Sequence, residues 1–361
     1  MARKYNFSAG PCTLPLSVLE QLRDTMVEHE NAGLSLIEAS HRSKEYEAVH
    51  DQTIELLREL LSVPQSHQVL LLGGGATLQF AMVPMNFLPA GSSCDLIHSG
   101  SWAGKALSDA EKIGTVRLAY DGKEFNYMTL PDADQLSLDS SAAYLHLTSN
   151  ETIGGVQFKD FPDSGSVPIV ADMSSDIMSR PFSFEKFGLI YAGAQKNLGP
   201  AGVTVVIIRE DMLERCPETL PAYLSYKTHA KTNSLYNTPP VFSINAMRLV
   251  LEWVKAEGGL AEFDNRSRLK SSILYDTIEG SNGYYRNPVD QRFRSTMNVV
   301  FRLPSEELEK QFISEATAAG FDGLKGHRSV GGCRASIYNA MPMEGVEALA
   351  DFMRDFSTKN G

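Results

Sequence analysis

The chain has 361 residues, of which 43% are hydrophobic and 21% are charged. This balance is typical of soluble globular proteins and excludes a disordered chain, while 28 glycines without a Gly-X-Y period exclude collagen. The 33 basic and 44 acidic residues give a net charge of −11, which argues against a general surface for nucleic acid or anionic membranes. At roughly 150 residues per domain, the length predicts two domains.

Apolar runs and cysteines indicate the compartment. The densest apolar runs, residues 69–72 and 203–208, are strand-sized and fall far short of the roughly 18 residues of a membrane span. The N-terminus lacks the apolar stretch of a signal peptide. The four cysteines are widely scattered, which favours a reducing compartment and predicts no metal site. We therefore expect a cytoplasmic protein with no nucleic-acid or membrane partner.

Short apolar runs without polar alternation recur through the first two thirds of the chain. They occupy residues 69–72, 95–98, 142–147, 167–171, 189–192 and 203–208. Such runs predict strands buried on both faces, in a mainly parallel sheet, and helices are expected over residues 77–88 and 103–113 between them. A buried helix segment remains the alternative for any single run. The predicted fold class is α/β, with a large domain over residues 16–258.

The pattern changes after the helix predicted at residues 243–255, which ends near Gly258. Further helices are expected at residues 260–278, from Ser305 onward and at residues 344–356, with strand-like runs at residues 297–303 and 334–338. This mixture predicts a smaller α+β domain over residues 259–361.

Lys196 lies in a turn of small residues that directly follows the apolar run 189–192. Flanking Gly and Ala suggest a backbone that approaches a ligand closely, and a partly desolvated amine can form a Schiff base with an aldehyde. An ordinary loop lysine explains Lys196 alone equally well.

Asp172 ends another apolar run, at the carboxyl end of a predicted strand, where open α/β sheets bind ligands. An aspartate there is often only a helix cap. Together, Lys196 and Asp172 match the needs of pyridoxal phosphate (PLP) enzymes, which use a lysine for the aldehyde and a carboxylate to keep the pyridine nitrogen protonated.

Weaker signals surround this pair. The turn at residues 73–75 is Gly-Gly-Gly, which suits a phosphate, but Leu78 stands where a dinucleotide fingerprint needs its third glycine. An NAD-dependent dehydrogenase is therefore disfavoured. Trp102, one of two tryptophans, suits either stacking on a flat ring or ordinary packing. Cations that could bind carboxylate or phosphate, or form a solvated basic face, are His41, Arg42, His327, Arg328 and Arg334.

The chain resembles the phosphoserine aminotransferases, which are class V, fold-type-I PLP enzymes, nearly from end to end. The matching segments are residues 6–11, 40–42, 150–155, 191–197, 237–240 and 326–340. The combination of Ala-Gln-Lys-Asn at residues 194–197 with Lys-Gly-His-Arg at residues 325–328 is specific to this family. The resemblance also implies that residues 1–15 pack against the small domain.

The resemblance implies a role for each matching residue. Lys196 would hold PLP and later move the α-proton of the substrate, and Asp172 would pair with the pyridine nitrogen. The other implied cofactor contacts are a ring stack by Trp102, a contact of Thr152 with the phenolic oxygen, and phosphate contacts by Ala76, Thr77, Gln195 and, from the neighbouring subunit, Asn237 and Thr238. A homodimer with composite sites is therefore part of the implied mechanism.

The implied reaction is reversible transamination between O-phospho-L-serine and 2-oxoglutarate, giving 3-phosphooxypyruvate and L-glutamate, in L-serine biosynthesis. A related phosphorylated substrate, 4-phosphooxy-L-threonine in pyridoxine biosynthesis, is also implied by the family. Arg334 would bind the α-carboxylate. The distal anion would be bound by His327 and Arg328 together with His41 and Arg42 of the partner chain. Some relatives carry an arginine where residues 76–78 read Ala-Thr-Leu, so other cations are expected to carry more of the anion recognition.

Two alternatives remain open at this stage. Cys333 in a glycine-rich segment suggests a cysteine desulfurase. Against this, such enzymes generally place a histidine where Trp102 stands. Release of sulfide from cysteine would reveal a desulfurase activity. A PLP-binding regulator without turnover is the other, and glutamate-dependent loss of cofactor absorbance would exclude it.

Overall fold

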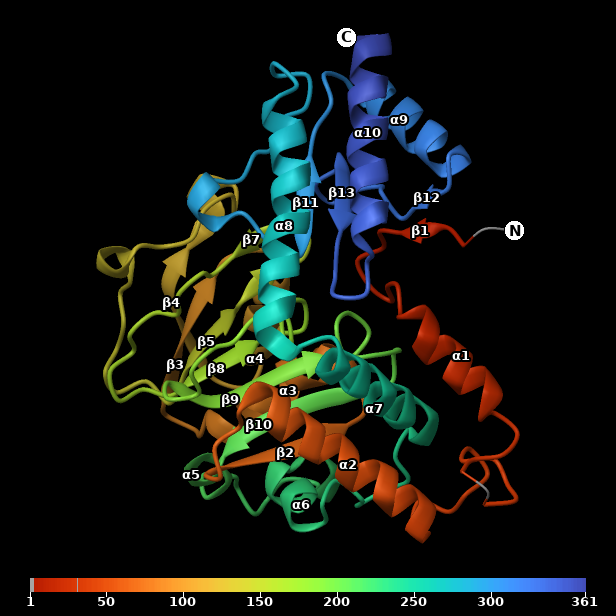
Figure 1. Ribbon diagram of the computed structural model, residues 1–361. Helices are drawn as coiled ribbons and strands as arrows, with labels where there is room; N and C mark the ends of the chain where they lie inside the picture. The colour runs from red at the N-terminus through yellow and green to blue at the C-terminus, as the bar shows by residue number, and fades with distance from the viewer. Residues whose placement is uncertain (1–2, 31) are drawn as a thin grey trace.

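The computed structural model describes residues 3–30 and 32–361. Its largest sheet has seven strands in the order β2-β10-β9-β8-β5-β3-β4 (Figure 1). Their bounds are β2 His67–Leu72, β3 Ser93–His98, β4 Thr115–Asp121, β5 Leu145–Thr148, β8 Ile169–Asp172, β9 Phe187–Gly193 and β10 Thr204–Arg209. Only β10 runs antiparallel to its neighbours, so the expected α/β fold with a mainly parallel sheet is confirmed.

Strand β4 is absent from the prediction because it is an edge strand that is mostly exposed or half-buried, unlike β2 at the opposite edge. Only Ala119 and Tyr120 of its residues are buried, and Arg117 on it pairs with Asp139 near the surface. An edge strand does not need the continuous apolar run that marks a strand covered on both faces.

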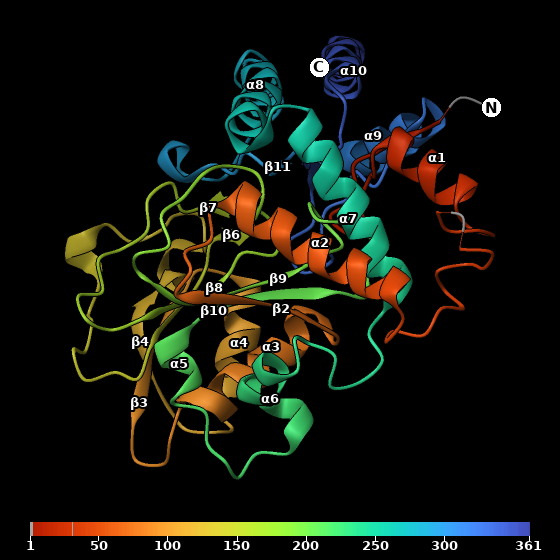
Figure 2. The same ribbon diagram turned by 60° about the horizontal axis from the view of Figure 1, so that its bottom comes forward.

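Helices cover both faces of the sheet, as Figure 2 shows. One face carries α2 (Lys44–Leu61) and α7 (Val241–Ala256), and the other carries α3 (Gly75–Phe87), α4 (Ser101–Ala110), α5 (Glu210–Leu213) and α6 (Tyr226–Lys231). The helices predicted over residues 77–88 and 103–113 both begin two residues too late, and they end one and three residues too late, respectively.

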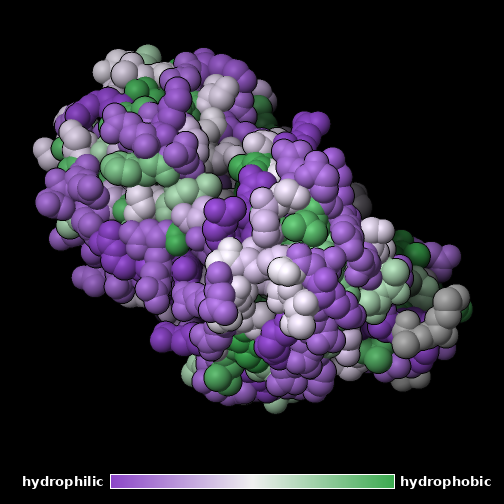
Figure 3. Space-filling model, turned by 90° about the horizontal axis from the view of Figure 1, so that it is seen from above, coloured by the Kyte–Doolittle hydropathy of each residue, from purple (hydrophilic) through white to green (hydrophobic). Residues whose placement is uncertain are grey.

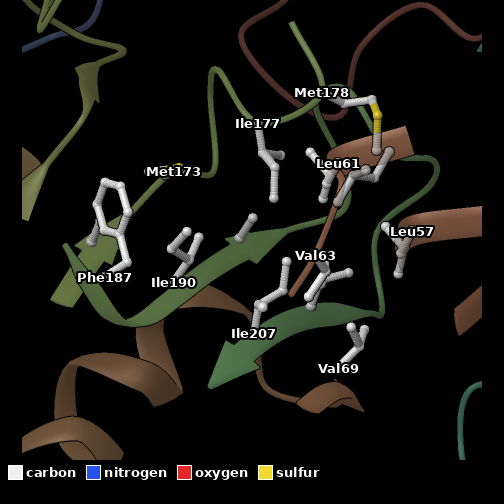
Figure 4. Close-up of a cluster of buried hydrophobic side chains, with 14 of the residues drawn as sticks. Leu57, Leu61, Val63, Val69, Met173, Ile177, Met178, Phe187, Ile190 and Ile207 are labelled. Carbon is white, nitrogen blue, oxygen red and sulfur yellow. The ribbon is translucent and has the colours of Figure 1, made fainter. Parts of the chain in front are cut away.

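Alternate residues of β2, β9 and β10 belong to different hydrophobic cores. Val69 of β2 packs with Leu57 and Leu61 of α2 and with Ile207 of β10 (Figure 4), whereas Leu70 belongs to the core on the α3 side. Burying each such side chain stabilises the fold by about 1.5–3 kcal/mol. This two-sided burial is the reason that the strand sequences are apolar without alternation.

A second, smaller region contains three helices and two short sheets. The helices are α8 (Gly259–Glu279), α9 (Glu306–Ala318) and α10 (Met343–Asn360); β11 (Asn298–Phe301) pairs with β13 (Cys333–Ser336), and β12 (Phe321–Asp322) pairs with β1 (Tyr5–Asn6). The hydroxyl of Ser305 accepts the Leu308 N–H, which explains why α9 begins there. β11 and β13 are shorter than the strands predicted at residues 297–303 and 334–338, and each starts one residue away from the predicted start. Cys333 therefore lies inside β13 rather than before it.

Two elements connect the regions. Helix α8 contributes Leu260 and Phe263 to the core beside the large sheet, and Leu274 and Ile278 to the core of the small region. At the N-terminus, β1 pairs with β12 and Phe7 is buried in the same small core, after which α1 (Leu16–Asp24) packs against α7. Figure 1 shows α8 passing from one region to the other.

The surface seen from above the small region is mostly hydrophilic, with hydrophobic residues in scattered small groups (Figure 3). Among the helices that residues 3–30 and 32–361 form, none combines the length and the hydrophobicity that crossing a membrane requires.

Candidate active site

The chemistry-bearing residues meet at one edge of the large sheet. Asp172 is the last residue of β8, and Lys196 follows β9 after a turn of two residues. Thr152 directly follows the short strand β6 (Asn150–Glu151), which pairs with β7 (Val156–Gln157). Because β8 and β9 are parallel neighbours, their carboxyl ends bring Asp172 and Lys196 to the same edge.

Lys196 is held in a polar but water-poor position. Its Nζ donates a hydrogen bond to the Thr152 hydroxyl at 2.7 Å, and the residue is only 8% exposed. Burial lowers the pKa of the Lys196 amine to about 8, against the opposing influence of the Asp172 and Glu151 carboxylates. About a tenth of this amine is therefore neutral, and nucleophilic, at pH 7, far more than for an exposed lysine.

The N-terminal segment contacts the backbone of this lysine. The Cys12 thiol donates a hydrogen bond to the Lys196 carbonyl at 2.6 Å. Gly10 has a φ of +132°, and a Cβ atom there would lie 3.2 Å from Cγ of Lys196. The conformation and the close approach both require glycine, so this segment supports the lysine turn from outside the sheet.

Asp172 is fully enclosed. Its Oδ1 accepts the Ser174 backbone N–H at 2.9 Å. Burial raises the pKa of the Asp172 carboxyl, and the nearby Lys196 ammonium opposes that rise. The carboxylate can therefore stabilise a positive charge brought to this edge of the sheet.

Trp102, the second residue of α4, forms a flat wall of the site. Its ring centroid lies 5.5 Å from Nζ of Lys196 and 4.1 Å from Nζ of Lys105. The indole Nε1 is buried and has no hydrogen-bond partner within residues 3–30 and 32–361. The ring offers a stacking face and an unused donor.

Arg334 of β13 brings a cation into the site from the small region. It is 9% exposed, and its Nη1 donates to the Thr152 carbonyl at 3.2 Å. Its Nε is buried without a partner in the part of the chain that the structure describes. Burial lowers the pKa of this guanidinium, and an anionic ligand would compensate for that cost.

More positive charge lies next to Arg334. Burial and the charges of Arg334, Arg328 and Lys105 lower the pKa of His327. Lys105 was not anticipated from the sequence, because a lysine in the middle of a helix carries no signal of its own. The arrangement can bind a small molecule that carries two anionic groups beside an amine-reactive centre.

Comparison with known proteins agrees with this geometry. The family model of class-V aminotransferases matches residues 4–349. The chain is 54% identical to the phosphoserine aminotransferases of Niallia circulans and of Geobacillus kaustophilus strain HTA426, with 99% of each chain covered. The chain belongs to the phosphoserine aminotransferases.

Solved structures of these aminotransferases have the same fold. The phosphoserine aminotransferase from Bacillus circulans subsp. alkalophilus superposes with a TM-score of 0.98 at 54% identity, and 99% of both chains are covered. The PLP-bound enzyme from Trichomonas vaginalis gives 0.93 at 39% identity, with 98% of this chain and all of that chain covered.

Other residues expected in the aminotransferase site lie at its border or apart from it. Ala76, the second residue of α3, packs on the hydrophobic core that Trp102 also borders, and Thr77 beside it is exposed. Gln195 is partly exposed next to Lys196. No hydrogen bond or ion pair within residues 3–30 and 32–361 connects the Lys196 cluster to four residues expected to act across subunits, namely His41, Arg42, Asn237 and Thr238.

A second feature that sequence reasoning missed is a clamp on the loop of residues 326–332. The Arg302 guanidinium donates to the Val330 carbonyl, and the Glu309 carboxylate accepts the Gly332 N–H at 3.1 Å. Arg302 and Glu309 also pair with each other at 3.4 Å. The two residues precede the loop by more than 15 positions, so no local pattern connects them with it.

Proposed function

We propose that the protein catalyses the reversible transfer of an amino group between O-phospho-L-serine and 2-oxoglutarate, with PLP as its cofactor. The products are 3-phosphooxypyruvate and L-glutamate. The observation that carries the proposal is the buried Lys196 amine, with a pKa near 8, between Thr152, Asp172 and the Trp102 ring. Its family membership supports the same reaction.

The residues present fit PLP. Lys196 is a nucleophilic amine, Asp172 is a buried carboxylate, and Trp102 presents both a ring face and an unpartnered Nε1. Gly74, with a φ of +87°, turns the chain into α3, and the N-terminus of that helix suits the phosphate group. PLP supplies an aldehyde that binds amino groups and a ring that withdraws electrons from the substrate α-carbon.

Each side chain then has a defined task. Asp172 keeps the proton on the pyridine nitrogen, because its carboxylate is stabilised by that positive charge. Lys196 accepts the proton from the substrate α-carbon and returns it, a role that suits an amine with a pKa close to neutral. Thr152 orients this amine through its hydroxyl, and its carbonyl accepts from Arg334, which binds the α-carboxylate.

Both amino-acid substrates carry a second anion at their far end. His327 and Arg328 lie next to Arg334, where they would bind this distal phosphate or carboxylate. One set of cations can therefore serve both half-reactions at a single site, which predicts ping-pong kinetics.

We further propose that the protein is a cytoplasmic homodimer and that the second copy completes each site with His41, Arg42, Asn237 and Thr238. Helix α1 packs against α7, and exposed large apolar side chains concentrate on and around these helices. They include Leu16, Leu19, Met26, Val27, Leu34, Ile37, Tyr236 and Phe242. Leu34 and Ile37 closely precede His41, and Tyr236 and Phe242 flank Asn237 and Thr238 in the sequence. Burial against a second copy would remove the exposed apolar side chains from water.

The cysteine desulfurase alternative is not favoured by the structure. The Cys333 thiol is buried inside β13, and burial raises its pKa, so a reactive thiolate is disfavoured.

The test is the visible absorbance of the purified protein before and after addition of phosphoserine. We expect the absorbance of bound PLP to shift with phosphoserine and to return with 2-oxoglutarate. Borohydride reduction and peptide mapping should label Lys196. Absence of any spectral response, or a label on another lysine, would contradict the proposal.

A further inference from the structure

Glu151 makes contacts that neither substrate binding nor proton transfer requires. This residue of β6 is 1% exposed, and its carboxylate reaches the first turn of α4. Its Oε2 accepts the Trp102 N–H at 3.1 Å, and its Oε1 accepts the Ala103 N–H at 2.9 Å. The N–H groups of a first helical turn have no partners within their own helix, so Glu151 satisfies two of them.

The sequence around α4 leaves this task to a distant residue. The residue before the helix is Gly100, which has no side chain to serve as a cap, and α4 has no acidic residue in its first turn. A Cβ atom at Gly100 would lie 2.6 Å from Cδ of Glu151. The missing side chain therefore provides the space that the Glu151 carboxylate occupies.

Glu151 also belongs to a short segment that is anchored on several sides. The Asn150 side chain donates to Ser175 and to Asn298 of β11, both at 2.8 Å. The next residue, Thr152, binds the Lys196 amine and the Arg334 guanidinium. A displacement of Glu151 would consequently change the position of α4 relative to the lysine.

We propose that Glu151 is a positioning residue that holds Trp102 at the correct depth and angle for stacking on the cofactor. The identity of the stacked ring rests on the proposed function. The placement of Trp102 by Glu151 is independent of it. Burial raises the pKa of Glu151 to about 7, while the Ala103 and Trp102 N–H groups oppose that rise. The positive end of the α4 dipole likewise favours the ionised carboxylate. Both carboxylate oxygens are engaged as acceptors, so an amide of the same shape can satisfy only one N–H.

The experiment uses the full-length protein with Trp253→Phe, which leaves Trp102 as the sole tryptophan. Glu151→Gln is compared with this parent, both with and without PLP. For the cofactor-free forms we expect Trp102 fluorescence in Glu151→Gln to be quenched by acrylamide about twofold more efficiently. The dissociation constant for PLP should rise roughly 10-fold, as expected for loss of a charged hydrogen bond.

Asp176→Asn is the matched control. Asp176 is another buried carboxylate near this edge of the sheet, and it accepts from Ser149 and from Gln157 rather than from α4. Its substitution should leave the quenching of Trp102 as in the parent. Equal quenching changes in both variants would show a general loosening and would overturn the proposal.

A second variant covers the case in which Glu151→Gln does not fold. Gly100→Ala keeps the carboxylate but forces it away from the helix, so it should raise Trp102 quenching in the same direction. Unchanged quenching and unchanged PLP affinity in the folded variants would refute the role of Glu151. If the parent itself binds no PLP, the proposed function fails, while the quenching comparison still tests Glu151.

Discussion

The cluster around Lys196 is held by its own chain differently from the half-buried His41 and the exposed residues Arg42, Asn237 and Thr238. Lys196 and Arg334 are buried and hydrogen-bonded to Thr152. The hydrogen bonds of the exposed residues go to near neighbours in the sequence, as when the Arg42 N–H donates to the Ser40 hydroxyl. A buried charge is costly unless a partner or ligand compensates for it, whereas an exposed charge costs little. The difference suggests that the first group is preorganised for chemistry, and that the second becomes ordered only against another surface.

The loop of residues 326–332 is intermediate between these two groups. It carries the exposed Arg328 and the partly exposed His327, yet Arg302 and Glu309 fix its backbone. The two cations of this chain that we propose for a variable distal anion thus lie on a tethered loop, while the cation proposed for the common α-carboxylate lies on a buried strand.

The sharpest way to test this comparison is to remove one residue of each group. Lys196→Ala should lower turnover to below about a thousandth, because it removes the residue that we propose as both the cofactor attachment and the base. If Arg42 acts on the neighbouring site, mixing inactive Lys196→Ala with impaired Arg42→Ala subunits should restore activity in heterodimers, which keep one intact site. Lys255→Ala, at an exposed ion pair, serves as the control. Failure of rescue despite verified subunit exchange would argue against shared sites.

Substitution of individual arginines should separate the near anion from the distal one. Arg334→Ala should lower kcat/KM by about 10- to 150-fold for phosphoserine, glutamate and alanine alike, because all three carry an α-carboxylate. Arg328→Ala and Arg42→Ala should impair the first two substrates and largely spare slow turnover of alanine. Single-turnover measurements with the three amino acids would decide this. Equal losses of kcat/KM for alanine and phosphoserine in Arg328→Ala would contradict the assignment of Arg328 to the distal anion.

The pH dependence of cofactor capture should reveal the buried environment of Lys196. With a pKa of about 8 instead of 10.5, about 10% of the amine is neutral at pH 7 rather than about 0.03%. Because only the neutral amine attacks the aldehyde, the rate of PLP capture should rise about 10-fold per pH unit up to pH 8 and then level off. Stopped-flow absorbance would measure it, with Nα-acetyl-lysine as the reference. A rate that climbs in parallel with the reference beyond pH 9 would show that the amine is not desolvated.

The smallest effect is expected from the clamp on the loop. Glu309→Gln should raise the KM for phosphoserine about threefold, because it weakens a partly exposed ion pair that holds the loop, and it should leave alanine turnover unchanged. Arg292→Ala, which removes surface ion pairs with Asp132 and Asp290, is the matched control. An equal effect on both substrates would show that the clamp supports the general stability of the protein rather than binding of the distal anion.

Local sequence patterns were sufficient for the architecture of the large sheet. Continuous apolar runs predicted six of its seven strands, because strands covered on both faces need apolar residues at every position. The edge strand β4 lacked that signal, and the start of α4 was misplaced because its cap comes from Glu151, 48 residues away from Ala103.

For the site, residue type and position after a strand were enough to single out Lys196, Asp172 and Trp102. The amino-acid sequence could not show that Thr152 binds both Lys196 and Arg334. It also could not show that Arg302 and Glu309 hold the loop of residues 326–332. The chemical type of a side chain and the local preference of its backbone depend on the residue itself and its neighbours in the sequence. Distances, burial and pKa shifts arise only when the tertiary fold brings together residues that are distant in the chain and removes water from between them.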